Sequence, residues 1–198
     1  LKSNLFNFPN DSRVFKRKNL LEILKIVNKV GFSRFTFDVI SNDLPSNKKI
    51  IIVAPHPDDE VIGLGGTLLR LLREKCTVEI IYMTSGKLSE KKIREQELKN
   101  VCTQLNVRFH IIGGVARDKL FGSEKIAQVI KNLNPSIIFM PFILDDNEDH
   151  RKTHNQLIIA LKGLSNKNKI NNIKIWSYQI YGPIIVNKVI DISNVINH

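Results

Sequence analysis

The sequence predicts an α/β fold in which helices cover both faces of a mainly parallel sheet. The first observation is the run Ile50–Val53, where no polar residue alternates with the apolar ones, as is typical of a strand buried on both faces. The second is the alternation of such short runs with longer segments whose apolar residues recur at helical spacing. Strands and helices in alternation indicate βαβ units with right-handed crossovers, which form a layered sandwich.

The N-terminal part differs from this pattern. We expect residues 1–47 to form an arm and a helix that pack on a domain spanning 48–198. Apolar residues at helical spacing predict the helix over Ser12–Val30, and Gly31 is its expected stop. The polar, proline-containing segment Ser41–Asn47 is typical of a loop.

The rest of the chain is expected to alternate between strands and helices. The strands are predicted over Lys49–Ala54, Thr77–Met83, Arg108–Ile112, Ser136–Met140, Asn172–Ile180 and Val186–Ile192. The helices are predicted over Thr67–Lys75, Ser89–Leu105, Ser123–Leu133 and Asp149–Leu164. Ser89 is the expected cap of its helix. Gly63, Gly65 and Gly66 precede the first of these helices, where they are expected to let the backbone approach a site closely.

The composition excludes several classes of protein. Of 198 residues, 42% are hydrophobic and 25% are charged, which suits a globular domain with a substantial core. No apolar run approaches the about 18 to 20 residues of a membrane-spanning helix, so no transmembrane segment is expected. The net charge of +11 comes from scattered lysines without interleaved aromatic residues, so no dedicated nucleic-acid binding is expected.

The cysteines bear on the expected compartment. Cys76 and Cys102 lie in unrelated elements and lack the CxxC spacing of metal or redox motifs. Two free thiols in a reducing compartment are therefore expected. No secretory signal is visible either, so the expected location is cytoplasmic.

Acidic residues and histidines gather after two of the predicted strands. His56-Pro57-Asp58-Asp59-Glu60 follows Lys49–Ala54, and Asp145-Asp146-Asn147-Glu148-Asp149-His150 follows Ser136–Met140. Carboxylates held this close repel one another and are costly to desolvate unless a cation compensates. Both turns lie at the carboxyl ends of parallel strands, where open α/β sheets form their sites. The sequence therefore predicts a divalent metal at this end of the sheet.

The residue types favour a catalytic zinc site. His56, Asp59 and His150 supply two imidazoles and a carboxylate, a set that leaves one zinc position for water. Asp58 is then a candidate base acting on the metal-bound water, and Asp149 is placed to orient a ligand from outside. The alternative, an acidic turn that only caps the next helix, needs a single acid rather than this cluster.

Several motifs are shared with a known family. They are Pro55–Glu60, Val61–Thr67, Arg94-Glu95, Asp149-His150, Trp176–Gln179 and Val189–Ile192. Together they resemble the PIG-L/LmbE-like family of zinc-dependent N-acetylglucosaminide deacetylases. The resemblance implies a Rossmann-like three-layer sandwich and a hydrolase that removes the N-acetyl group from an N-acetylated amino sugar or sugar conjugate. Because that family usually continues beyond Asp191, the domain is expected to be truncated at its C-terminus.

By matching position, the resemblance implies roles for individual residues. The implied metal ligands are His56, Asp59 and His150, and the implied base is Asp58. Arg94 is the implied substrate contact, and Glu60 is expected to bind substrate as well.

One position departs from the family pattern. The second motif of the family commonly reads His-x-Asp-His, and Asn147 stands at its first position. An asparagine amide can donate a hydrogen bond to an oxyanion, but it cannot act as a general acid. His154, one turn beyond His150, is a candidate replacement, although we favour an ordinary surface role for it.

Three functions therefore stay open. The first is a zinc hydrolase in which zinc-bound water attacks the acetamide, with Asp58, Asn147 and Asp149 as its catalytic residues. The second is a catalytically attenuated member that binds a metal and a glycan, and the third is a metal-dependent amidase on another conjugate. Zinc is the expected cofactor, with another divalent metal as the alternative, and an N-acetylated sugar or glycoconjugate is the expected partner.

Overall fold

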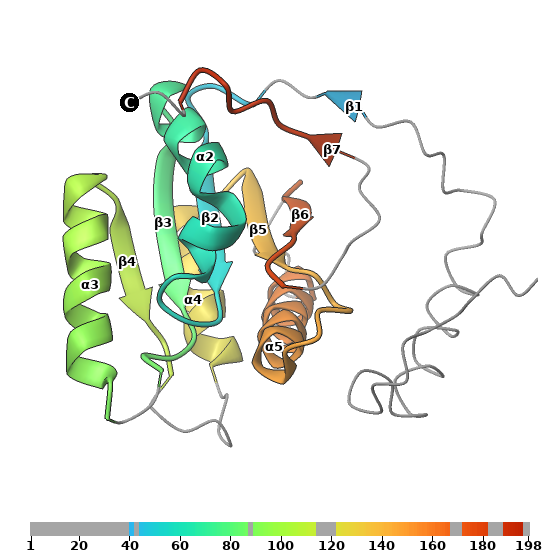
Figure 1. Ribbon diagram of the computed structural model, residues 1–198. Helices are drawn as coiled ribbons and strands as arrows, with labels where there is room; N and C mark the ends of the chain where they lie inside the picture. Colours follow the sequence, from blue (N-terminus) through green and yellow to red (C-terminus); the bar gives the residue numbers. More distant parts are fainter. Residues whose placement is uncertain are drawn as a thin grey trace, which may run out of the picture. The chain divides into compact units, whose positions relative to one another are not determined.

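The computed structural model describes residues 40–41, 44–86, 89–113, 122–166, 172–181 and 188–195 (Figure 1). All of them belong to the unit Val39–His198. The helix predicted over Ser12–Val30 lies outside the described residues, so the N-terminal arm and helix stay a prediction.

A five-stranded parallel sheet forms the centre of the described structure. Its strands are β2 (Lys49–Ala54), β3 (Thr77–Tyr82), β4 (Arg108–Ile111), β5 (Ile137–Pro141) and β6 (Lys174–Tyr178). They lie in the order β4-β3-β2-β5-β6, so the direction of winding reverses between β2 and β5. In open α/β sheets, ligands bind outside the carboxyl ends of the strands at such a switch point.

Helices cover both faces of this sheet, which confirms the predicted three-layer α/β fold (Figure 1). On one face lie α2 (Asp59–Arg73) and α3 (Lys91–Gln104), and on the other lie α4 (Ser123–Leu133) and α5 (Glu148–Ser165). In β2, Ile50 and Ile52 belong to the hydrophobic core between the sheet and helices α2 and α3. Ile51 and Val53 belong to the core between the sheet and helices α4 and α5. This alternation explains why the strand is apolar throughout.

A short parallel pair completes the described strands. β1 (Ile40–Ser41) pairs with β7 (Lys188–Val189), and neither joins the central sheet. The strand predicted over Val186–Ile192 is thus shorter in the described residues and lies in a different sheet.

The start of α2 corrects one prediction. The helix begins at Asp59 rather than at Thr67, so Gly63, Gly65 and Gly66 lie inside it and not in a loop before it. A Cβ atom on Gly63 would fall 2.5 Å from Cδ2 of Tyr178, and one on Gly66 would fall 2.6 Å from Cδ1 of Ile192. These two glycines therefore let the helix pack closely on β6 and on the C-terminal segment.

The start of α3 also differs from the prediction. α3 begins at Lys91, and Glu90 occupies its N-cap position without a side-chain capping bond, so Ser89 does not cap this helix as predicted. Cys76 and Cys102 are both buried and free. Of the helices in the described ranges, none combines the length and apolarity needed to cross a membrane.

Candidate metal centre

The two histidine-containing turns meet because their strands are neighbours. His56 follows β2, and His150 lies in the first turn of α5, which follows β5. Asp59 is the first residue of α2. One ligand atom from each of these three residues lies within 4.8 Å of the other two, so together they could hold a metal ion. The three predicted ligands are therefore brought into one cluster.

Asp59 is the centre of this cluster. Its Oδ2 atom lies 3.1 Å from Nδ1 of His56 and 3.3 Å from Nε2 of His150, and it accepts the backbone N–H of His56 at 2.9 Å. Asp59 and His150 are both fully buried. Burial acts to raise the pKa of Asp59, but the contacts with His150 and His56 outweigh it and lower this pKa to about 2. The carboxylate is therefore ionised at neutral pH.

A second carboxylate lies behind each imidazole. Nε2 of His56 lies 3.1 Å from Oδ2 of Asp149, and Nδ1 of His150 lies 3.1 Å from Oδ1 of Asp145. A carboxylate on the outer nitrogen fixes the ring orientation and makes the inner nitrogen a better metal ligand. In each histidine, one nitrogen thus lies beside an outer carboxylate while the other faces Asp59.

The polar atoms of the cluster fit a cation. Among the described residues, Asp59 Oδ1, Asp145 Oδ2 and both ring nitrogens of His150 are buried without a geometrically adequate hydrogen-bond partner. Buried polar atoms are nearly always satisfied, and unpaired buried charge is costly. Burial acts to lower the pKa of His150, but Asp59 and Asp145 raise it above its ordinary value. A positive charge is therefore favoured here, and two imidazoles with one carboxylate are a donor set that suits zinc.

Asp58 lies at the edge of the cluster, where a base is needed. Its side chain is 48% exposed, and Nη1 of Arg94 lies 3.4 Å from its Oδ2. Its backbone has a φ of 117°, which residues with side chains rarely adopt and which recurs at functional sites. Partial burial and the nearby Asp59 carboxylate raise the pKa of Asp58, with Arg94 opposing the shift.

Arg94 is engaged within the protein. Besides Asp58, its guanidinium bonds Glu90 at 3.0 Å and lies 3.4 Å from the carbonyl oxygen of Pro57. The expected substrate contact therefore lies beside the candidate base and is placed to position it.

Glu60 lies inside the fold beside the cluster. Its side chain is buried, with Oε1 accepting the Tyr82 hydroxyl at 2.8 Å and Oε2 accepting the Asp58 N–H at 3.2 Å. Both carboxylate oxygens of Glu60 therefore have partners within the protein, and its binding of substrate stays a prediction. It anchors the turn that carries Asp58 to β3.

Asn147 is the N-cap of α5. Its Oδ1 accepts the backbone N–H of Asp149 at 2.9 Å, and its own N–H donates to Oδ1 of Asp145 at 2.9 Å. His154, further along α5, has Nδ1 within 3.1 Å of the Pro141 carbonyl oxygen. The second turn is therefore organised by side-chain oxygens that bind backbone N–H groups at the start of a helix.

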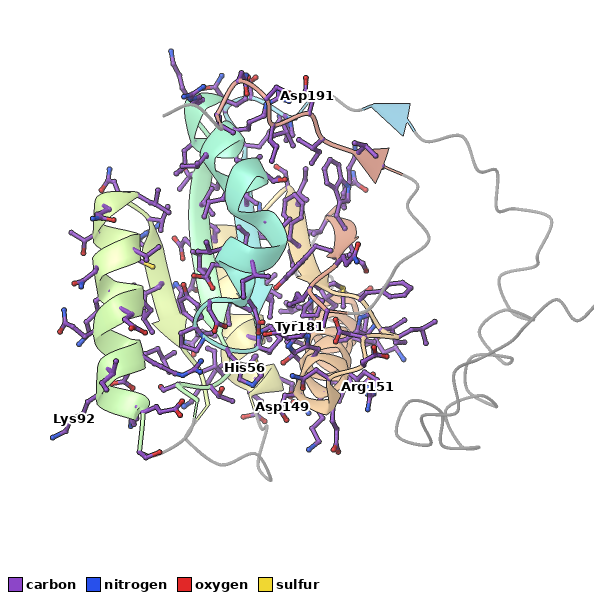
Figure 2. The ribbon with its side chains drawn as sticks, viewed as in Figure 1. His56, Lys92, Asp149, Arg151, Tyr181 and Asp191 are labelled. Atoms are coloured by element: carbon purple, nitrogen blue, oxygen red, sulfur yellow. The ribbon has the colours of Figure 1, made fainter. Side chains whose placement is uncertain are left out.

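Two residues of this site had no predicted role, Asp145 and Tyr181. Asp145 lies in the acidic turn between β5 and α5, and this position in the sequence is the signal that could have identified it. The Tyr181 ring stacks on His150, with ring centres 5.5 Å apart and planes inclined by 22°. Figure 2 shows Tyr181 at the same end of the sheet as His56 and Asp149. Its sequence context, a tyrosine shortly after a strand, carries no motif.

Comparisons with known proteins find relatives of this chain in sequence and in structure. A family model described as PIG-L, GlcNAc-PI de-N-acetylase, matches residues 51–161. A Bacillus cereus protein with the name "Probable N-acetyl-alpha-D-glucosaminyl L-malate deacetylase 2" is 29% identical over 115 residues, covering 48% of this chain and 52% of the relative. A Bacteroides thetaiotaomicron protein with the name "Putative glucosamine-6-phosphate deaminase-like protein" is 34% identical over 126 residues, covering 61% of this chain and 16% of the relative. The chain thus spans about half of one curated relative and a small part of the other.

A solved structure shows the same fold. It is the N,N'-diacetylchitobiose deacetylase from Pyrococcus horikoshii, which is 20% identical to this chain with a TM-score of 0.58. The match covers 97% of this chain and 77% of that chain. At this identity the likeness concerns the α/β architecture alone.

Proposed function

The chain belongs to the PIG-L family, and from this premise we propose that it removes the N-acetyl group from an N-acetylated amino sugar or sugar conjugate. Zinc is the proposed metal, with His56, Asp59 and His150 as its ligands. One observation supports this function best. The imidazoles of His56 and His150 both face the buried Asp59 carboxylate, and each has a second carboxylate on its other side. The deacetylase name of the Bacillus cereus relative supports the reaction class.

The chain's own groups fit hydrolysis of an acetamide. A zinc ion held by His56, Asp59 and His150 would supply a bound water of lowered pKa and would polarise the amide carbonyl. Asp58 accepts the proton, because its carboxylate is about half exposed and its raised pKa lies nearer to neutrality. Arg94 holds the side chain of Asp58, and Glu60 holds its backbone N–H. Asp145 and Asp149 keep the two imidazoles in orientation.

Asn147 is the proposed partner of the oxyanion. Its Oδ1 is occupied by the helix cap, so the NH2 group is the end of the amide that donates. A donor aimed at the developing negative charge stabilises the tetrahedral intermediate. The proton for the leaving amine then comes from the carboxyl group of Asp58, since an amide cannot supply it.

Acetate release tests this function. Zinc-loaded protein is incubated with N-acetyl-D-glucosamine and N,N'-diacetylchitobiose, and acetate is measured. We expect Asp58→Asn to lower turnover by about a hundredfold or more while zinc still binds at one ion per chain. Asp146→Asn, a matched change on an exposed carboxylate in the neighbouring turn, should leave turnover unchanged. Absence of acetate release from any N-acetylated sugar, or full turnover by Asp58→Asn, would overturn the proposal.

A catalytically attenuated metal- and glycan-binding protein is the second candidate, and Asn147 favours it. This position carries an amide that caps α5, where the family pattern has an imidazole. Asn147→His discriminates between the two candidates. A large gain in acetate release identifies the native chain as attenuated, whereas no gain supports an intact reaction with Asp58 as the proton donor.

The metal cluster also fits a substrate other than a sugar. The same cluster would serve a metal-dependent amidase on another conjugate, so N-acetylated amines without a sugar are compared with N-acetyl-D-glucosamine in the acetate assay. Faster release from the amines would favour the amidase.

A cytoplasmic location is proposed from the two free cysteines, Cys76 and Cys102.

A further inference from the structure

Tyr181 covers one face of a proposed metal ligand. It lies three residues beyond the end of β6, and its ring is nearly parallel to that of His150, at 5.5 Å between ring centres. His150 itself is fully buried. The Tyr181 ring therefore lies beside the metal cluster, at the end of the sheet where Figure 2 also shows His56 and Asp149.

The rest of the Tyr181 side chain is open to solvent. The residue is 59% exposed and belongs to neither hydrophobic core. Tyr178, three residues earlier, shows the structural alternative, because it is 4% exposed and donates its hydroxyl to the Val53 carbonyl at 2.9 Å. The end of β6 thus carries two tyrosines with different surroundings. Tyr178 packs in the interior, whereas Tyr181 keeps an aromatic surface exposed beside the cluster.

An exposed aromatic ring beside a reactive centre is a feature of ligand sites. Such sites combine aromatic walls with a few polar groups that fix orientation. A pyranose ring has one face lined by C–H groups, which can lie on an aromatic ring while the sugar hydroxyls stay hydrated. Tyrosine suits this contact because its body is apolar and its tip is polar.

We propose that the Tyr181 ring is a stacking platform for the sugar ring of the substrate, which holds the adjoining N-acetyl group over the metal ligands. This inference rests on the proposed function and adds to it a residue that positions the substrate, through the C–H face of its sugar ring. Tyr181 acts by positioning substrate and takes no part in proton transfer.

Two variants separate the aromatic face from other roles of the side chain. Tyr181→Phe keeps the ring and removes the hydroxyl. Tyr181→Leu still covers His150 but lacks an aromatic face. KM and kcat for N-acetyl-D-glucosamine are measured at saturating zinc, together with the zinc content of each protein. Binding of the same sugar is measured independently by saturation-transfer NMR on the zinc-loaded proteins.

If the Tyr181 ring is a stacking platform, its loss should raise KM while kcat changes little. Tyr181→Leu should raise KM by about tenfold, the upper part of the range for aromatic contacts, with kcat within about threefold of wild type. Tyr181→Phe should keep the wild-type KM, and both variants should bind one zinc ion per chain. An unchanged KM in Tyr181→Leu, or an equal rise in both variants, would overturn the platform.

The binding measurement separates this inference from the proposed reaction. If wild-type protein releases no acetate but binds N-acetyl-D-glucosamine, and Tyr181→Leu loses that binding, deacetylation fails while the platform stands. If acetate is released and both variants bind and turn over the sugar like wild type, the platform fails while deacetylation stands. Wild-type protein that neither binds nor deacetylates the sugar overturns both.

Discussion

Nδ1 of His150 lies 3.1 Å from Oδ1 of Asp145, and both side chains are buried at the start of α5. The same Asp145 oxygen accepts the backbone N–H of Asn147. The helix start and the proposed ligand are thus held by one carboxylate. This arrangement links the fold of the second turn to the metal site.

Asp145→Asn should weaken zinc binding. The amide keeps the size of the side chain but removes the charge that orients His150, and loss of such an outer carboxylate typically costs about 10- to 100-fold in metal affinity. Competition with a chromophoric chelator measures the affinity. Asp146→Asn is the control, because Asp146 is exposed and its backbone carbonyl, rather than its side chain, accepts from Arg151. Equal affinity in Asp145→Asn and wild type would contradict the role of this carboxylate.

Replacing Asn147 should reveal its capping role. Asn147→Ala removes the oxygen that accepts the Asp149 N–H, and we expect the free energy of unfolding to fall by about 1 kcal/mol. Asn147→Asp retains a capping oxygen and should keep the wild-type stability. Urea denaturation followed by circular dichroism measures both variants. A wild-type midpoint for Asn147→Ala would show that the cap contributes nothing.

Alanine substitutions at two glycines of α2 should change the stability of the protein in opposite directions. In Gly63→Ala, the new methyl group would lie 2.5 Å from Tyr178 Cδ2 and 2.8 Å from the Gln179 carbonyl oxygen, so we expect a loss of about 1–3 kcal/mol. In Gly65→Ala, the nearest atom is 3.6 Å away, and the helix should gain about 0.5–1 kcal/mol. Thermal and urea denaturation of the pair give the comparison. The close packing of α2 would be refuted by equal stabilisation in both variants.

The parallel sheet and the ligand cluster could be predicted because local patterns encode them. Ile50–Val53 is apolar throughout since both of its faces are buried, and this pattern identifies a central strand. Acidic turns after β2 and β5 meet because parallel strands end at one edge of the sheet. His56, Asp59 and His150 could therefore be grouped before their positions were seen.

The remaining features depend on tertiary contacts that have no local pattern. Glycine disfavours a helix by about 1 kcal/mol per residue, so the sequence around Gly63 and Gly66 did not predict the start of α2. In the structure, close packing at these two glycines overrides that preference. Glu60 belongs to the first motif, but its direction is set by Tyr82 on β3. Tyr181 is linked to the site by its stacking contact with His150, which lies in another element.

We propose that one cation is held jointly by the turns that follow β2 and β5. Anomalous diffraction at the zinc edge, on crystals of the zinc-loaded full chain, tests it most directly. We expect a single peak at about 2.0–2.2 Å from ligand atoms of His56, Asp59 and His150. A zinc peak elsewhere, or none at these three residues in zinc-saturated crystals, would contradict the account.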